Sequence, residues 1–204
     1  EKVAVNGIIA RKNFEDAGYP KNKLVDVEAL RFNHIKKKRN QTITPTKHDP
    51  TLLVLGDYLS ENVDKQLKLL DRCSDIRNFN IIVKPHPNNQ IVLDPYPNLK
   101  HAQVNNDPLN ILFTNCDVVY SCNVSSGAVE AYLKGLKVII ILDPEELNIS
   151  PLKDIDSVSF VTNHIELSKS LNSLSQNNLD LIDYFFLDCE LPRWKKLIYD
   201  SLSL

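Results

Sequence analysis

The stretch YSCNVSSGAVEA at residues 120–131 decides how the rest of the chain is read. It continues a short apolar run at residues 117–120, whose length predicts a buried strand rather than a helix. Ser125 and Ser126 suit the cap of the next helix, which is predicted to end at Gly135. The amides at the start of such a helix favour an anion such as phosphate, although an ordinary strand-to-helix turn is an equal alternative.

Apolar runs and helical patterns alternate along the middle of the chain. Besides the run before Ser121, apolar runs predict strands at residues 51–56, 79–83, 137–142 and 158–161, with a short one at residues 98–104. Helices are predicted after a Ser60 cap, after an Asp107 cap at residues 108–115, and at residues 165–174. Strands that are apolar throughout and separated by helices predict an α/β fold, a Rossmann-like parallel sheet with helices on both faces.

The composition of the chain predicts three parts. Residues 1–45 form the end of one domain and a polar, basic linker, residues 46–178 form the Rossmann-like domain, and residues 179–204 form a C-terminal helical segment. The first part contains a small β-α-β unit, with strands predicted at residues 2–5 and 23–27.

The C-terminal segment is predicted to be helical across residues 180–202. Pro192 is expected to interrupt this helix, because proline removes a backbone donor and clashes with the preceding turn. Trp194 just beyond it is interpreted as a packing anchor.

Composition and charge exclude several classes of function. The 204 residues are 43% hydrophobic and 25% charged, which is ordinary for a soluble globular protein. A net charge of −2 argues against a nucleic-acid partner. The basic run at residues 36–39 is interpreted as linker, with attraction to anionic lipid as the lesser alternative. The sequence shows neither a membrane span nor a signal peptide, so we expect a cytoplasmic protein, with the inner face of the membrane as an alternative location.

Cysteines and histidines give no sign of a metal site. The four cysteines lack metal-ligand spacing, so no metal is expected, and Cys116 and Cys122 are predicted to be core residues. Four of the five histidines have no partner pattern and are interpreted as surface residues: His34, His48, His101 and His164.

The segment Lys84-Pro85-His86-Pro87 is the sharpest local motif. It follows a predicted strand, and its two prolines hold the backbone extended around the histidine. An imidazole fixed in this way can donate a hydrogen bond to a phosphate or protonate a departing one. A structural histidine in a proline-rich turn is the alternative.

Small and polar residues follow other strands at the same predicted edge of the sheet, where ligands of such folds bind. Gly56 follows one strand, and the serine stretch follows another. The stretch has neither a nucleophile-elbow nor a Walker pattern, so its serines are expected to bind phosphate rather than to act as nucleophiles. Glu130 is expected either to bond to a ribose hydroxyl or to face solvent. Asp143, Glu145 and Glu146 are weaker candidates for contact with a sugar.

Together these segments resemble the C-terminal, donor-binding half of a GT-B glycosyltransferase. The resemblance is to the bacterial surface-polysaccharide group that includes sialyltransferase-like, Kdo-transferase-like and glycerophosphotransferase-like enzymes. Residues 84–87 resemble its His-Pro motif, and Ser121 with residues 125–131 resembles its serine motif. Residues 5–7, 18–20 and 29–32 look like the passage from its N-terminal domain, so the resemblance covers most of residues 1 to 165.

The resemblance implies a nucleotide-sugar donor and a glycan acceptor on the bacterial surface. A CMP-activated acidic sugar is the favoured donor, a UDP-sugar is the alternative, and no cofactor is expected. His86 is the implied catalytic residue, which stabilises the departing phosphate in a direct displacement without a metal. The implied donor-binding residues are Gly56, Lys84, His86, Ser121, Asn123, Ser125, Ser126, Gly127 and Glu130.

The catalytic base of this group lies in the N-terminal domain. We therefore expect that domain to be the partner of this half and to supply the base, without which the half is inactive. A non-hydrolysing sugar-nucleotide epimerase shares the architecture and is an alternative. A non-catalytic domain that kept the fold is a further one.

Overall fold

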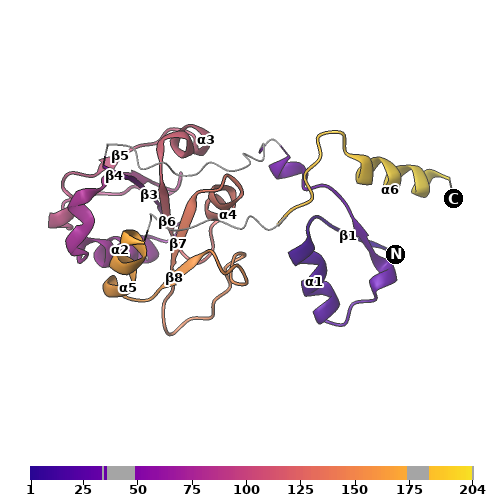
Figure 1. The fold of residues 1–204 in the computed structure, drawn as a ribbon, viewed down its shortest axis with the longest axis horizontal. Coiled ribbons are helices and arrows are strands. Elements are labelled where there is room, and N and C mark those ends of the chain that lie inside the picture. Colours follow the sequence, from indigo (N-terminus) through magenta and orange to yellow (C-terminus); the bar gives the residue numbers. More distant parts are fainter. Residues whose placement is uncertain (34, 36–48, 174–183, 204) are drawn as a thin grey trace. The chain divides into compact units, whose positions relative to one another are not determined.

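The computed structural model describes residues 1–33, 35, 49–173 and 184–203 (Figure 1). It divides into two compact units. Unit 1 combines Glu1–Lys37 with Leu181–Leu204, and unit 2 is Lys38–Asp180. The predicted linker after residue 33 falls almost entirely outside the described residues, and the predicted domain boundaries stay predictions.

Within the described residues, unit 2 contains a six-stranded parallel sheet, as predicted, in the order β5-β4-β3-β6-β7-β8. The chain begins at the centre, moves outward through β4 to β5, and then returns to β6 on the other side of β3, which makes the β3–β6 boundary the point where the winding reverses. The strands are β3 (Thr51–Leu55), β4 (Asn80–Lys84), β5 (Gln103–Val104), β6 (Val118–Ser121), β7 (Lys137–Ile141) and β8 (Ser159–Val161).

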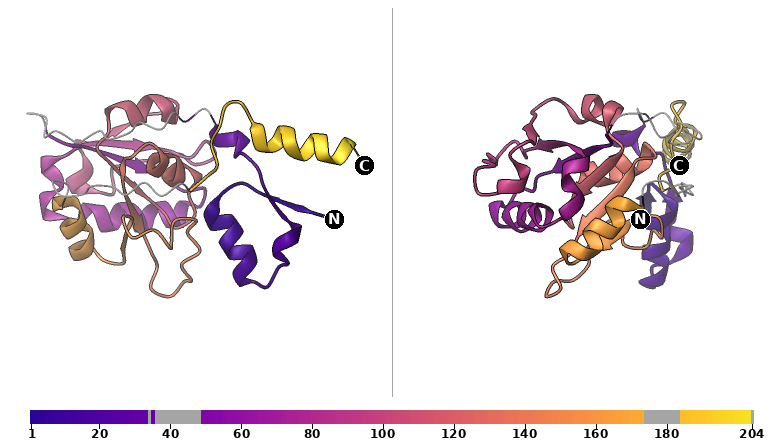
Figure 2. Two further views of the ribbon diagram at one scale, coloured as in Figure 1. Left: turned by 45° about the vertical axis from the view of Figure 1, so that its right-hand side comes forward. Right: turned by 60° about the vertical axis from the view of Figure 1, so that its left-hand side comes forward.

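Helices cover both faces of this sheet (Figures 1 and 2). One face carries α2 (Ser60–Asp71) and α5 (His164–Asn172), and the other carries α3 (Leu109–Leu112) and α4 (Ser126–Leu133). Short 3₁₀ turns lie at Ser74–Asn78, Pro97–Leu99 and Phe113–Asn115. Burial on both faces explains why the strands are apolar throughout: alternate strand residues enter the α2/α5 core, which includes Leu52, Val54, Leu67, Val118, Tyr120, Ile139 and Leu167.

Two predicted helix caps are wrong, and neighbouring polar side chains explain why. Ser60 is the first residue of α2 rather than its cap. The side chain of Asp57 instead accepts a hydrogen bond from the Leu59 amide, just before the helix, at 2.9 Å. Asp107 does not cap α3, whose N-cap residue is Pro108 and has no side-chain cap, and the Asp107 amide donates to the side chain of Asn105 at 2.7 Å. The helix predicted at residues 108–115 is accordingly a four-residue α-helix followed by a 3₁₀ turn.

Unit 1 contains the predicted β-α-β element. Strands β1 (Val3–Val5) and β2 (Leu24–Asp26) are parallel and are connected through α1 (Ile8–Asp16). Arg11 of α1 ties the element together by donating to Asp26 at 2.7 Å. Helix α6 (Pro192–Leu202) completes the unit, and Phe186 bonds through its backbone to Asn6 and Ala29.

The prediction that Pro192 interrupts a longer helix is wrong. Residues 184–191 are not helical, and Pro192 occupies the first turn of α6, where its missing N–H costs nothing. Residues 180–183 of the predicted helix lie outside the described part of the chain.

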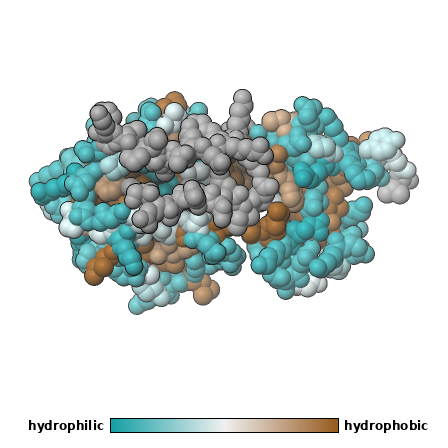
Figure 3. Space-filling model, viewed as in Figure 1, coloured by the Kyte–Doolittle hydropathy of each residue, from teal (hydrophilic) through white to brown (hydrophobic). Residues whose placement is uncertain are grey.

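The described surface is mostly hydrophilic in the view of Figure 3, with hydrophobic side chains in small groups. Scattered apolar residues of this kind are normal on a folded protein. Among the described helices, none is both long enough and apolar enough to cross a membrane.

Candidate functional site

Three strands of unit 2 end at the same level. Leu55, the last residue of β3, is the register partner of both Lys84 in β4 and Ser121 in β6. Because neighbouring strands lie about 4.8 Å apart, the outer two of these strand ends are about 10 Å from each other. The segments that contain Gly56, His86 and Ser125 therefore leave the sheet side by side, as the sequence predicted for one edge.

Gly56 brings the end of β3 against the backbone of the His-Pro segment. Its amide donates to the Lys84 carbonyl at 2.9 Å. A Cβ atom on Gly56 would lie 3.3 Å from that carbonyl oxygen, 3.5 Å from the His86 nitrogen and 2.9 Å from the side chain of Ile91. The absence of a side chain thus permits this close approach. Lys84 itself is half-buried, and its Nζ donates to the Asn106 carbonyl at 3.0 Å.

His86 is held in a defined orientation at this edge. Its Nδ1 accepts from the backbone amide of Asn88 at 3.2 Å, and its ring meets Tyr58 edge-on with centroids 5.5 Å apart. An imidazole whose Nδ1 accepts carries its proton on Nε2 when it is neutral. His86 is half-buried, and in this tautomer Nε2–H is the hydrogen-bond donor of the ring.

The serine stretch forms the start of α4. Ser125 is the N-cap, as predicted, and its Oγ accepts from the Ala128 amide at 3.2 Å. Ser126 is exposed in the first turn, and Glu130 follows four residues later on the same side of the helix. Gly135 ends the helix with a positive φ of 80°, the predicted C′ conformation.

Gly127 allows α4 to pack closely against Leu55 and Leu109. It is buried, and a Cβ atom there would lie 2.9 Å from a methyl group of Leu55 and 3.3 Å from one of Leu109. The glycine therefore lets α4 start directly over the end of β3.

Ser121 and Asn123 occupy different depths. Ser121 is fully buried, and its hydroxyl donates a hydrogen bond to the Cys122 carbonyl at 3.2 Å. It therefore stabilises the backbone at this edge from inside the core. Asn123 is half-buried and donates at 3.0 Å to the Leu147 carbonyl, which links the loops after β6 and β7. That Ser121 and Asn123 contact a ligand stays a prediction.

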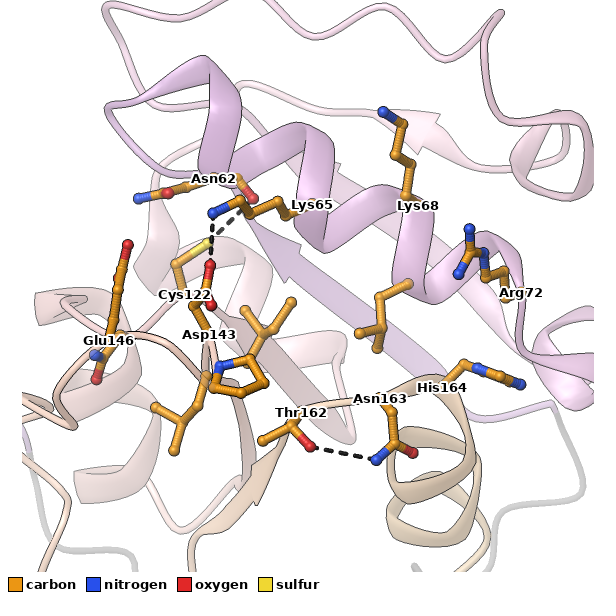
Figure 4. A pocket seen from close by; sticks show the side chains of 15 residues that line it. Asn62, Lys65, Lys68, Arg72, Cys122, Asp143, Glu146, Thr162, Asn163 and His164 are labelled. Atoms are coloured by element: carbon orange, nitrogen blue, oxygen red, sulfur yellow. Dashed lines mark hydrogen bonds and ion pairs between the residues drawn. The ribbon is translucent and has the colours of Figure 1, made fainter.

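A cavity of about 360 Å³ lies next to this edge, on the α2/α5 face (Figure 4). The sequence did not predict it, although the basic residues of α2 share a helical face, and His164, expected on the surface, is half-buried at its wall. The lining residues are Asn62, Lys65, Lys68, Leu69, Arg72, Cys122, Asn123, Ile141, Leu142, Asp143, Pro144, Glu146, Thr162, Asn163 and His164.

One ion pair closes an end of this cavity. Lys65 of α2 and Asp143, which follows β7, approach to 2.6 Å. The hydrogen bond from Lys65, together with one from the Glu145 amide, lowers the pKa of Asp143, and the same carboxylate raises the pKa of Lys65. Asp143 is therefore held as a carboxylate and is poorly suited to accept a proton.

The described residues offer no cluster of three histidine, cysteine, aspartate or glutamate side chains that could hold a metal ion.

No protein-family model matches the sequence, and no curated protein matches it either. Solved structures do match. A structure described as a putative UDP-N-acetylglucosamine 2-epimerase from Listeria monocytogenes is 14% identical, with a TM-score of 0.63, over 97% of this chain and 58% of that one. Anabaena HepE in complex with UDP-glucose is 13% identical, with a TM-score of 0.54, over 99% of this chain and 63% of that one.

The wall teichoic acid polymerase TagF is a third similar structure, 13% identical with a TM-score of 0.54, over 99% of this chain and 58% of that one. The chain has the fold of the C-terminal domain of GT-B glycosyltransferases. At these identities the likeness establishes the fold alone. The chain spans between 58% and 63% of the length of these three structures.

Proposed function

We propose that the chain is the donor-binding half of a glycosyltransferase that uses a nucleotide-activated sugar. The observation that carries this proposal is the level ending of β3, β4 and β6, which sets Gly56, His86 and the capped start of α4 along one edge. A helix start and an oriented imidazole are both suited to a phosphate group. The edge lies where the winding of the sheet reverses, the usual ligand position in such folds.

A UDP-activated sugar is the donor that we favour. Its support is that a structure of the same fold, Anabaena HepE, is a complex with UDP-glucose. The CMP-activated acidic sugar expected from the sequence has no comparable support in the three structures described above. The glycan acceptor and the N-terminal domain remain part of the proposal, as does a bacterial surface glycan as the product.

In the proposed reaction the chain stabilises the departing nucleotide phosphate. His86 donates from Nε2 to a phosphate oxygen, and the first-turn amides of α4 face the same group. The donor's anomeric carbon is attacked directly by the acceptor hydroxyl, and the N-terminal domain supplies the base that removes the proton from that hydroxyl.

Calorimetric titration of the full chain with UDP, CDP and CMP tests the proposal. UDP is expected to bind most tightly. His86→Ala and Ser126→Ala are each expected to weaken UDP binding about tenfold, since a hydrogen bond to a charged group contributes about 1.5–3 kcal/mol.

Two exposed residues of the same types provide matched controls. His101→Ala and Ser74→Ala should leave the UDP affinity unchanged, because both side chains are exposed and lie away from the proposed edge. Absence of binding by all three nucleotides, or binding that His86→Ala and Ser126→Ala leave intact, would sink the proposal.

A sugar-nucleotide epimerase is the second candidate, favoured by the TM-score of 0.63 to the Listeria structure. The two candidates differ in their product. Incubating the chain, joined to its N-terminal domain, with UDP-N-acetylglucosamine distinguishes them, because an epimerase releases an isomerised sugar without an added acceptor.

A further inference from the structure

The cavity on the α2/α5 face is a built site that the proposed function does not use. Its walls come from α2, from the loops after β6 and β7, and from the start of α5. The Lys65–Asp143 pair fixes α2 against the loop after β7, so the space is formed before any ligand arrives. Of its lining residues, Asn123 is the one shared with the proposed donor edge.

The acidic side chains of the cavity lie away from Arg72. Lys65 is paired with Asp143, and Lys68 is paired with Asp64 at 2.7 Å. Arg72 makes no ion pair with any residue of the described ranges. Arg72 and His164 lie at the same end of the cavity in Figure 4, away from Asp143 and Glu146. This end can receive an anion, and an arginine binds a phosphate through two parallel hydrogen bonds.

The opposite end accepts and donates hydrogen bonds. Asn62 and Glu146 lie there in Figure 4, and Asn123, which donates to the carbonyl of Leu147 next to Glu146, also lines the cavity. Part of the cavity wall is apolar, formed by Leu69, Ile141, Leu142 and Pro144. Such a wall suits a flat ring with apolar faces and polar edges better than a sugar ring, whose hydroxyls would lose hydrogen bonds with water.

The length of the cavity distinguishes between ligands. Lys65 and Arg72 are seven residues apart on one face of α2, which is about 10 Å along the helix axis. A free phosphate ion would occupy the Arg72 end and leave the apolar wall bare. A molecule with a flat base at one end and a phosphate at the other fills both.

We propose that this cavity is a second binding site, specific for a nucleoside monophosphate. The phosphate lies between Arg72 and His164, the base lies on the wall formed by Leu69 and Pro144, and the base edge bonds with Asn62, Asn123 and Glu146. The proposal does not rest on the proposed function, because neither Arg72 nor His164 belongs to the donor edge.

Titration of the full chain with UMP, CMP, AMP and inorganic phosphate tests the site. At least one of the three nucleotides is expected to bind with a Kd below about 1 mM. Inorganic phosphate is expected to bind at least tenfold more weakly. Arg72→Glu should weaken nucleotide binding at least tenfold, whereas Arg77→Glu, a charge reversal at another exposed arginine, should change it less than twofold.

His86→Ala separates the two sites. Titration should shift the amide resonances of Leu69 and Leu142, which line the cavity, and His86→Ala should leave these shifts unchanged. Absence of binding by all three nucleotides overturns the proposal. So does binding that His86→Ala abolishes and Arg72→Glu spares, since the nucleotide then occupies the donor edge. Far-ultraviolet circular dichroism of the variants shows that each is folded.

Discussion

Trp194 donates two hydrogen bonds to Glu28. The Glu28 carboxylate accepts from the Trp194 amide at 3.1 Å, and the indole Nε1 of Trp194 donates to the Glu28 carbonyl at 2.8 Å. The same carboxylate accepts from the Arg193 amide at 3.0 Å and from its guanidinium at 3.1 Å. A buried carboxylate therefore caps α6 at the position where its first amides have no helical partners.

Replacement of Glu28 should make unit 1 less stable and less sensitive to acid. Burial is the largest single influence and raises the pKa of Glu28, but the bonds from Arg193 and Trp194 together hold it below its ordinary value. Stabilisation is then complete above the unfolded pKa of about 4.3 and is lost as the pH falls through the lower folded value. Glu28→Gln should cost about 1–3 kcal/mol at pH 7.

Trp194 is the only tryptophan of the chain, so its fluorescence during urea unfolding reports this change directly. The wild-type chain should lose more stability between about pH 5 and pH 3 than Glu28→Gln does. Glu190→Gln is the matched control, because that side chain is 87% exposed. Equal acid sensitivity in wild type and Glu28→Gln would contradict the assignment.

Gly7→Ala should destabilise unit 1 severely. A Cβ atom on Gly7 would lie 2.0 Å from the Tyr184 carbonyl oxygen, and this oxygen belongs to the backbone, which cannot turn aside as a side chain can. We expect a loss of more than about 3 kcal/mol in urea unfolding. Gly18→Ala is the comparison: its φ of 80° gives strain of about 1 kcal/mol without any contact within 4 Å. A larger loss for Gly18→Ala would refute this reasoning.

Gln66 connects the two central strands of unit 2. It is fully buried, and its Nε2 donates to the carbonyls of Tyr120 at 3.1 Å and Leu55 at 3.3 Å. Gln66→Leu keeps the volume approximately but leaves both carbonyls without this donor, so a loss of about 2–4 kcal/mol is expected in thermal or urea unfolding. Gln90→Leu, at an exposed position, should be neutral within about 0.5 kcal/mol. A Gln66 variant as stable as the wild type would show that the bridge contributes nothing.

Thiol labelling should distinguish one cysteine from three. Burial raises the pKa of Cys116 and Cys122 to about 12 and also raises that of Cys73, whereas Cys189 is exposed. Because the thiolate is the reacting form, a chromogenic disulfide reagent at pH 8 should modify one thiol rapidly in the native chain and four in denaturant. Loss of the rapid phase in Cys189→Ser identifies the residue. Rapid reaction of two or more native thiols would disprove the burial.

The sheet could be predicted from sequence because its strands are buried on both faces. Runs such as Leu52 to Leu55 and Val138 to Ile141 carry this signal without any knowledge of their neighbours. Ser125 could be predicted as a cap for a similar reason, since its partner Ala128 is three residues away. The start of α2 was harder to predict from the sequence. Ser60 was predicted to be its cap, but Asp57 accepts the hydrogen bond from the Leu59 amide at this point.

The cavity could not be predicted, because its walls meet only after the sheet has formed. Lys65 and Asp143 are far apart in sequence, and their contact depends on β3 and β7 being separated by β6 alone. On the sequence, Lys65, Lys68 and Arg72 look like the solvent face of an ordinary amphipathic helix. The depth of Ser121 is hidden in the same way, since a serine next to a strand end reads as surface.

Unit 1 joins segments from opposite ends of the chain, whereas unit 2 is continuous. On the ribosome, unit 2 is complete in sequence before the residues that follow it emerge. The β1-α1-β2 element must wait, because Glu28 and Gly7 find their partners in residues 184–194. The order of synthesis therefore allows the Rossmann-like unit to fold first, and unit 1 can close only after residues 184–194 have been made.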